Sequence, residues 1–175
     1  MINNKKKTKI RSQNELSARK KEFLLICDIL DEVKIKYFLK NGILLGAVRE
    51  KNFIKWDWDV EFSVFSEDFL PKINQITFLL KKNNFNIVKV VDKKNGPKID
   101  FYGKYPRIVT SYCIWSWNYS KSKNIYWRKE LSVPSKFLKK LSKIEFLGRK
   151  FYCPSNPKQY LTWVYGNWQV PFNSS

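Results

Sequence analysis

The sequence has 175 residues, of which 43% are hydrophobic and 17% aromatic, enough to form the core of one domain and too many for wholesale disorder. It contains no histidine and only three widely spaced cysteines, which excludes the usual His/Cys zinc sites and Ser-His or Cys-His nucleophiles. The net charge of +19 favours a polyanionic partner, although a lysine-rich soluble surface accounts for it equally well.

The N-terminal segment is polar and cationic. We expect residues 1–12 to form a disordered basic tail and residues 13–175 to form a single domain. The longest apolar run, Phe23 to Cys27, is too short to cross a bilayer, and no apolar segment of signal-peptide character follows the tail. These features predict a cytoplasmic protein.

The first half of the chain alternates between helical and strand patterns. Apolar residues recur at helical spacing from Asn14 to Val33, which predicts an amphipathic helix. The elements expected after it are a strand over 37–39, a turn at 41–42, a short helix over 43–50, a loop over 51–56, a strand over 57–65, a helix over 67–82 capped by Ser66, and a strand over 85–91.

The second half is richer in strand patterns. Its expected elements are a strand over 98–102, a β-rich aromatic segment over 107–117, a polar loop over 118–130, a hairpin over 144–152, and a helix that follows Ser155-Asn156-Pro157 and ends near residue 166. No internal repeat is visible in the sequence.

The strand over 57–65 carries an unusual acidic pattern. Carboxylates alternate there with large apolar side chains in the order Asp57, Trp58, Asp59, Val60, Glu61 and Phe62. Alternate strand residues share a face and lie roughly 6–7 Å apart, so the three carboxylates repel one another unless a proton or cation intervenes. Because Mg²⁺ prefers oxygen ligands, the pattern fits a magnesium platform. It equally fits a half-exposed strand with an acidic solvent face.

Two further features add weight to the magnesium reading. The turn and short helix after residue 40 would present backbone N–H groups to a phosphate, and Arg49 could add a bidentate contact. Asp100 lies between apolar residues in a strand, where an acid needs a partner, so a neighbouring strand could bring it beside Asp59 and Glu61. The plainer readings are a simple turn for Gly42, a surface ion pair for Arg49 and a solvent-facing position for Asp100.

Several segments resemble the LicD/fukutin family. The stretch YFLKNGILLGAVREKNFIKWDWDVEF is similar to its signature, and PSNPKQYLTWVYGNWQVP is similar to its C-terminal motif. The KIDFYG strand stands where members carry an acid between hydrophobic residues. The resemblance covers about residues 20–171. It departs from the family pattern at Ile43, where the family has Thr, at Trp58, where it has Asp, and at Glu61, where it has Asp.

The resemblance implies a small nucleotidyltransferase-like α+β fold, in which helices flank a mixed β-sheet. It implies Mg²⁺-dependent (or Mn²⁺-dependent) transfer of a substituted phosphoryl group from a CDP-linked alcohol donor to a hydroxyl of a cell-surface glycan. The residues it assigns as catalytic and metal-binding are Asp57, Asp59, Glu61 and Asp100, and those it places at the donor phosphates are Gly42, Ile43 and Arg49. Either Asp100 or Asp57 would accept the proton of the attacking hydroxyl.

The basic, aromatic second half would then hold an anionic or glycan acceptor. The tryptophans expected as stacking platforms are Trp115, Trp117, Trp127, Trp163 and Trp168. The positive charge also allows peripheral contact with the cytoplasmic face of a membrane. Two other functions stay open: a protein of the same fold that acts on or binds RNA, and a non-catalytic relative that binds a glycan or a partner enzyme.

Overall fold

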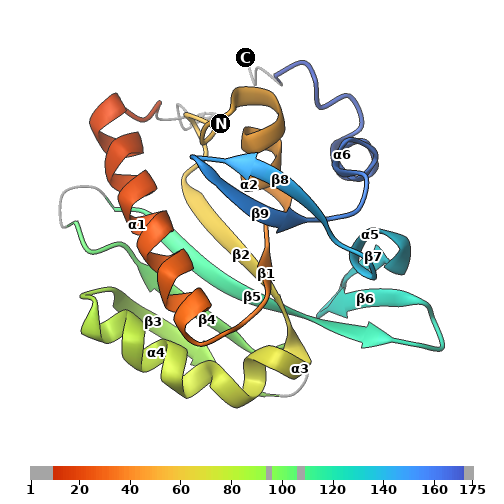
Figure 1. The fold of residues 1–175 in the computed structure, drawn as a ribbon, viewed down its shortest axis with the longest axis horizontal. Coiled ribbons are helices and arrows are strands. Elements are labelled where there is room, and N and C mark those ends of the chain that lie inside the picture. Colours follow the sequence, from red (N-terminus) through yellow and green to blue (C-terminus); the bar gives the residue numbers. More distant parts are fainter. Residues whose placement is uncertain (1–9, 94–95, 106–108, 172–175) are drawn as a thin grey trace, which may run out of the picture.

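A mixed β-sheet forms the centre of the structure (Figure 1). The structure is a computed structural model that describes residues 10–93, 96–105 and 109–171, so most of the expected tail lies outside the described residues. Within these ranges the strands are β1 (Tyr37–Phe38), β2 (Asp59–Phe65), β3 (Asn86–Val91), β4 (Lys98–Tyr102), β5 (Ser111–Ser120), β6 (Ile125–Arg128), β7 (Leu131–Pro134), β8 (Ser142–Phe146) and β9 (Arg149–Cys153). They follow the spatial order β3-β4-β5-β2-β1-β9-β8, and β6 and β7 extend the far end of β5.

The helices complete an α+β fold, as the sequence predicts. They are α1 (Gln13–Glu32), α2 (Asn41–Leu45), α3 (Ser66–Phe69), α4 (Ile73–Lys82), α5 (Ser135–Leu138) and α6 (Pro157–Tyr165). The pairs β2–β5 and β1–β9 are parallel, and the other strand pairs are antiparallel. The sheet is therefore mixed.

Helix α1 covers one face of the sheet together with α4 (Figure 1). It begins at a capping box, in which the Ser12 hydroxyl accepts from Glu15 N–H and the Glu15 carboxylate accepts from Ser12 N–H. Its Phe23 side chain is fully buried and stacks on Phe62 of β2, with ring centroids 5.0 Å apart. Burying aromatic side chains in this way supplies much of the stability of the core.

Strand β2 has one buried apolar face and one polar face. Val60, Phe62 and Val64 are buried on the side of α1. Side chains alternate along a strand, so Asp59, Glu61 and Ser63 lie on the opposite face. Trp117 of β5 lies on that second face, since its Nε1 donates to Ser63 Oγ at 3.3 Å.

Strand β2 is shorter than the sequence predicts. It begins at Asp59 rather than at residue 57, and Trp58 is 65% exposed instead of joining the buried face. Arg11 and Arg19 bind the carbonyl oxygens of residues 57 and 58, and these bonds replace pairing with a neighbouring strand. The alternation of residues 57–62 predicts that Trp58 shares the buried face of Val60 and Phe62, and this prediction is wrong.

The predicted helix over 67–82 is interrupted. Helix α3 is followed by a 3₁₀ turn at Leu70–Lys72 and only then by α4. Pro71 lies in the 3₁₀ turn and has no N–H to donate, which breaks a continuous α-helical pattern. Ser66 is the first residue of α3 and makes no side-chain cap, so the predicted role of its hydroxyl is also wrong.

The predicted polar loop over 118–130 is a β-hairpin. Strand β5 continues to Ser120, and β6 pairs with it antiparallel from Ile125 to Arg128. The hairpin places Arg128 beside the tryptophans of β5. The predicted hairpin around Leu147-Gly148 and the C-terminal helix are both confirmed, and the Asn156 side chain caps α6.

The segment expected as a turn at 41–42 belongs to α2. A π-helical turn, Gly46–Glu50, continues this helix, so the short helix expected over 43–50 is present. A Cβ at Gly46 would lie 2.5 Å from the carbonyl oxygen of Asn52, so glycine allows the helix to approach the loop closely.

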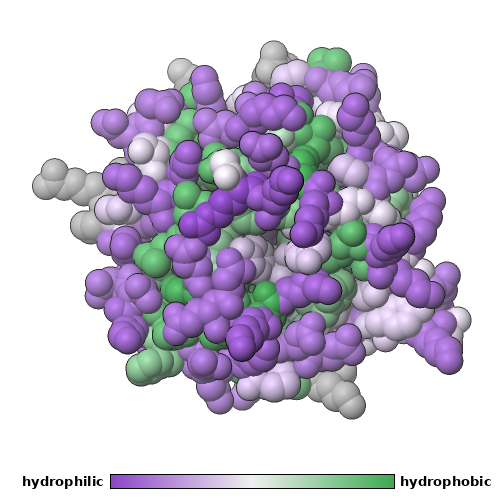
Figure 2. All heavy atoms as spheres, in the orientation of Figure 1, coloured by the Kyte–Doolittle hydropathy of each residue, from purple (hydrophilic) through white to green (hydrophobic). Residues whose placement is uncertain are grey.

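Hydrophilic residues cover most of the face seen in Figure 2, with smaller apolar patches between them. Across the described residues, no helix combines the length and the apolar composition that a membrane span needs.

Candidate active site

The start of α2 and the start of β2 enclose a polar pocket of about 260 Å³. We call it the acidic pocket; its lining residues are Lys40, Asn41, Gly42, Ile43, Asp57, Asp59, Glu61 and Tyr165. Five of the seven predicted site residues therefore line one cavity. The family signature is continuous in sequence, and the chain reverses direction within it, so that residues 40–43 and residues 57–61 line the same pocket.

Gly42 lets Asp57 lie directly against α2. A Cβ at residue 42 would overlap Oδ2 of Asp57, and only glycine leaves room for the carboxylate. The carbonyl oxygen of Asp57 accepts from Arg11 Nε and Arg19 Nη1, both at 2.9 Å. Burial lowers the pKa of Arg19 to about 10, so this residue stays charged at neutral pH. The two arginines fix the backbone that carries Asp57.

Asp57 and Asp59 form a close pair of carboxyl groups. The pKa of Asp57 is raised to about 6, first by burial, then by the negative charge of Asp59 and by a hydrogen bond to it. A bound cation would relieve this repulsion, and the two carboxylates are oxygen donors of the kind that Mg²⁺ prefers. The pair therefore fits a divalent cation.

Glu61 lines the same pocket but is already held by other side chains. Asn41 Nδ2 donates to its Oε2 at 3.3 Å, and Arg128 Nη2 lies 3.7 Å from its Oε1. Tyr160 of α6 in turn donates to Asn41 Oδ1 at 3.0 Å. In the part of the chain that the structure describes, no group of three Asp, Glu, Cys or His side chains converges tightly enough to hold one ion. The cation site that these residues offer is thus the Asp57–Asp59 pair, with Glu61 next to it.

Asp100 lies on the same face of the sheet but two strands from Glu61. The register aligns Glu61 with Cys113 of β5, and Cys113 with Asp100 of β4. Asp100 forms an ion pair with Lys98, and the Cys113 thiol donates to it at 2.9 Å. It does not line the acidic pocket. Strand β5 separates β4 from β2, so Asp100 is not on the strand next to β2.

Arg49 also lies outside the acidic pocket. Its guanidinium forms an ion pair with Glu50, donates to the carbonyl oxygen of Trp168 at 3.0 Å and lies 5.9 Å from the centroid of the Trp56 ring. In this arrangement Arg49 fastens the segment after α6 to the π-helical turn. Its contact with a donor phosphate stays a prediction.

Sequence reasoning missed the cations around the pocket. Lys40 is 6% exposed and lines the pocket, and its ammonium lies 3.9 Å from the centroid of the Trp117 ring. Burial and the charge of Arg128 lower the pKa of Lys40 to about 7. Arg19 could have been found, because it stands among the apolar positions of the first helix. Nothing in the local sequence marks Arg128.

Two of the five predicted aromatic platforms are buried. Trp117 and Trp168 are at most 9% exposed and cannot offer a ring face to a sugar. Trp115 and Trp127 are half-buried, and Trp163 is 48% exposed. These three remain candidates for stacking.

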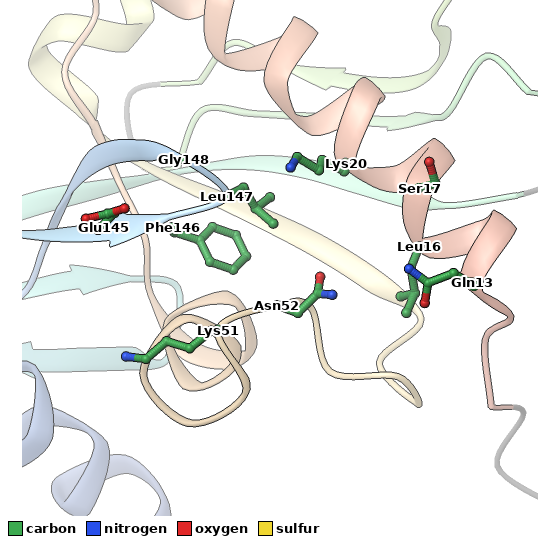
Figure 3. Close-up of a pocket in the computed structure, with 10 residues that line it drawn as sticks. All are labelled: Gln13, Leu16, Ser17, Lys20, Lys51, Asn52, Glu145, Phe146, Leu147 and Gly148. Atoms are coloured by element: carbon green, nitrogen blue, oxygen red, sulfur yellow. The ribbon is translucent and has the colours of Figure 1, made fainter.

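Cavities larger than the acidic pocket lie elsewhere in the structure. One of about 640 Å³ lies between the first turns of α1, the loop at residues 51–52 and the β8–β9 turn, and contains none of the predicted site residues (Figure 3). Another, of about 600 Å³, is lined by aromatic residues such as Tyr126 and Tyr152 and by Lys36, Lys139 and Lys140. Trp117 also lines this second cavity and contacts Lys40, which links it to the acidic pocket.

Comparison with known proteins places the chain in a family. The sequence model described as "LicD/FKTN/FKRP, nucleotidyltransferase domain" matches residues 34–156, which include the whole acidic pocket except Tyr165. The chain belongs to the LicD/FKTN/FKRP family.

Individual relatives are distant. The chain is 24% identical over 167 residues to proteins of mouse and human named ribitol 5-phosphate transferase FKRP, an alignment that covers 86% of this chain and 32% of each relative. It is 25% identical over 154 residues to the uncharacterized protein T07A5.1 of Caenorhabditis elegans, covering 80% of this chain and 39% of that protein. The chain thus spans about a third of the length of these curated relatives.

Proposed function

We propose that this protein transfers a substituted phosphoryl group, such as a polyol phosphate or phosphocholine, from a CDP-linked donor to a hydroxyl of a glycan. The observation that carries the proposal is the acidic pocket, in which the family signature brings Asp57, Asp59 and Glu61 together beside Lys40. The name of the mouse and human relatives, ribitol 5-phosphate transferase, supports the same class of reaction.

The carboxyl pair of Asp57 and Asp59 would hold a Mg²⁺ ion, with Glu61 beside it. When bound, the ion would neutralise charge on the donor diphosphate and on the departing nucleotide. Phosphoryl transfer depends mainly on positioning and charge neutralisation, so the absence of histidine is compatible with it.

The proton of the attacking hydroxyl needs an acceptor in the pocket. Of the two carboxylates that the sequence offers, Asp57 lines the pocket and Asp100 does not. Asp57 is therefore the carboxylate that would act as the general base. Its two oxygens allow one to face the cation while the other accepts the proton.

The test is turnover by Asp59→Asn with CDP-ribitol, CDP-glycerol and CDP-choline as donors in the presence of Mg²⁺. We expect kcat/KM to fall by roughly 10²–10³-fold, the loss typical when one charge-stabilising group is removed from an active site. Asp28→Asn, at an exposed residue of α1 paired with Arg149, is the matched control and should keep full activity. Normal turnover by Asp59→Asn would disprove the proposal.

Calorimetry with the same donors separates this function from the two alternatives. A transferase should bind a CDP-linked alcohol more tightly with Mg²⁺ than without it. A protein that acts on RNA should instead bind RNA or nucleoside triphosphates with a steep salt dependence. A non-catalytic relative should show no Mg²⁺-dependent binding of any cytidine nucleotide.

A further inference from the structure

Two buried cations lie close together beside the acidic pocket: Lys40 lines it, and Arg128, which does not, contacts the same Trp117 ring as Lys40. Arg128 of β6 is 5% exposed and Lys40 is 6% exposed. Burial lowers the pKa of both side chains, and the positive charge of Arg128 lowers that of Lys40 further. Within the described residues, Arg128 forms an ion pair with Glu61 and Lys40 forms none. Two positive charges therefore share one carboxylate.

The guanidinium of Arg128 also lacks hydrogen-bond partners. Its Nε and Nη1 atoms are buried, and no acceptor for them occurs in the described part of the structure. Its Cζ lies 3.9 Å from the centroid of the Trp115 ring and 4.9 Å from that of Trp117. Cation–π contacts with these rings do not satisfy the N–H groups of the guanidinium, which still need acceptors. Buried donors without acceptors are costly and rare in native proteins.

The neighbourhood is arranged as alternating cations and aromatic rings. Lys98 lies 4.7 Å from the Trp115 ring centroid, Arg128 contacts both Trp115 and Trp117, and Lys40 contacts Trp117. This series runs along the sheet face that carries Glu61. It ends at Lys40, which opens into the acidic pocket. An anion in the pocket would meet the ammonium first and the guanidinium behind it.

We infer that Lys40 and Arg128 form a binding subsite for a phosphate group. Phosphate oxygens would supply both the missing negative charge and the missing acceptors. The Nε and Nη1 atoms of Arg128 are buried. Phosphate binding to them therefore requires a neighbouring side chain, Lys40 or Glu61, to rotate. The role of this subsite in catalysis rests on the proposed function, whereas phosphate binding itself does not require it.

The experiment measures binding of inorganic phosphate and of pyrophosphate by calorimetry and thermal shift at pH 6, below the lowered pKa of Lys40, with EDTA present to remove divalent cations. The variants are Lys40→Met and Arg128→Met, with Arg128→Lys as the conservative change. Lys20→Met is the matched control, because Lys20 is an exposed lysine of α1 that does not line the acidic pocket. We expect phosphate to raise the Tm of the wild type and of the control, and binding by either Met variant to be at least about tenfold weaker.

The Tm in phosphate-free buffer distinguishes a loss of phosphate binding from a loss of folding. Lys40 has no ion-pair partner among the described residues, so Lys40→Met should raise the Tm in phosphate-free buffer, while the phosphate-dependent increase disappears in both Met variants. A lower Tm for Arg128→Met together with unchanged phosphate binding by Lys40→Met would show that Arg128 only supports Glu61, and would overturn the inference. Failure of the wild type to bind either anion would also overturn it.

Two further arms identify the source of the phosphate. Binding of CMP that depends on both cations assigns the subsite to the donor, and binding of a sugar phosphate but not of CMP assigns it to an anionic glycan acceptor. The two proposals can fail separately. Phosphate binding without transferase activity would refute only the proposed function, and full turnover with normal phosphate binding in both Met variants would refute only this subsite.

Discussion

Gly42 determines how close the two halves of the site can come. The helix that begins at residue 41 and the segment that carries Asp57 meet at this residue, and any side chain there would displace the carboxylate. Gly46, one helical turn later, faces a backbone carbonyl of Asn52 instead of a side chain. Substitution of Gly42 should therefore affect the position of a site carboxylate, whereas substitution of Gly46 should affect the packing of the backbone.

Gly42→Ala should reduce activity while leaving stability nearly intact. Alanine favours helix by about 1 kcal/mol over glycine, which offsets the cost of turning the Asp57 carboxylate away. The free energy of unfolding should change by less than about 1 kcal/mol, and kcat/KM should fall at least about tenfold because the carboxylate loses its position. Urea denaturation and steady-state kinetics measure the two effects.

Gly46→Ala is the matched comparison. Its Cβ would overlap a backbone oxygen that cannot rotate away, so it should destabilise the fold by about 1–3 kcal/mol. Equal stability losses in the two variants would show that Asp57 is not free to turn and would contradict this account of Gly42.

At the scale of elements, α1 does more than cover the sheet. Its buried Glu22 accepts from the N–H groups of Lys104 and Tyr105, at 2.7 and 3.3 Å, and from the Tyr112 hydroxyl at 2.7 Å. The same helix sends Arg19 to the carbonyl oxygen of Asp57. One helix thus ties the segment after β4 to the start of β5 and also fixes the acidic pocket.

Glu22→Ala should destabilise the protein strongly. It would leave three donors without their acceptor, at about 1–3 kcal/mol for each that stays buried. We expect a loss of about 3 kcal/mol or more in the free energy of unfolding, measured by urea denaturation. Glu22→Gln keeps one acceptor oxygen and should lose less.

Asp28→Ala on the same helix is the control for a lost carboxylate. Asp28 pairs with Arg149 at the surface, 2.6 Å apart, so its removal should change stability by less than about 1 kcal/mol. A Glu22→Ala variant as stable as this control would show that water replaces the lost acceptor.

Two elements show where local patterns were insufficient. Residues 118–130 include the hairpin in which the last residues of β5 pair with β6, and short strands with many polar residues resemble loops in sequence. Trp58 continues an alternating pattern, but the backbone carbonyls of residues 57 and 58 bind Arg11 and Arg19 rather than a neighbouring strand. In both cases pairing partners distant in sequence decided the outcome.

At the scale of the whole molecule, the positive charge acts on stability as well as on partners. The protein carries 34 Lys and Arg residues against 15 Asp and Glu, and a few of these cations are buried. Lys40 is the clearest case, because burial lowers its pKa from 10.5 to about 7. The unfolded chain holds this proton up to a much higher pH than the folded protein does.

Stability should therefore rise with pH above 7. Between pH 7 and 10.5 the unfolded chain binds the Lys40 proton and the folded protein does not, so this residue adds up to about 1.4 kcal/mol of stability per pH unit. Below pH 7 both states are protonated and that contribution is absent. Urea denaturation at pH 7, 7.5 and 8 measures the slope, because burial raises the pKa of the cysteine thiols and their ionisation in the unfolded chain lowers stability near pH 9.

Lys40→Met supplies the comparison. The variant should be more stable than the wild type at pH 7, and the difference should shrink as the pH rises. Parallel stability curves for the two proteins would contradict the burial of a protonated amine at this position.

The sequence by itself determined most of the elements and the chemistry of the acidic segment. Helical and alternating apolar spacing is local information, so α1, β4, the β8–β9 hairpin and α6 could be predicted from it. The family signature identified Gly42, Ile43 and the three acids, which do line one pocket.

Only the tertiary structure decided which charged groups meet. It placed Asp100 two strands from Glu61, turned Arg49 toward Trp168, and brought Lys40 and Arg128 together from segments 88 residues apart. Such contacts depend on strand order and register, which arise from the packing of the whole core. Local spacing encodes which face of an element is buried, but it does not encode the partner that covers that face.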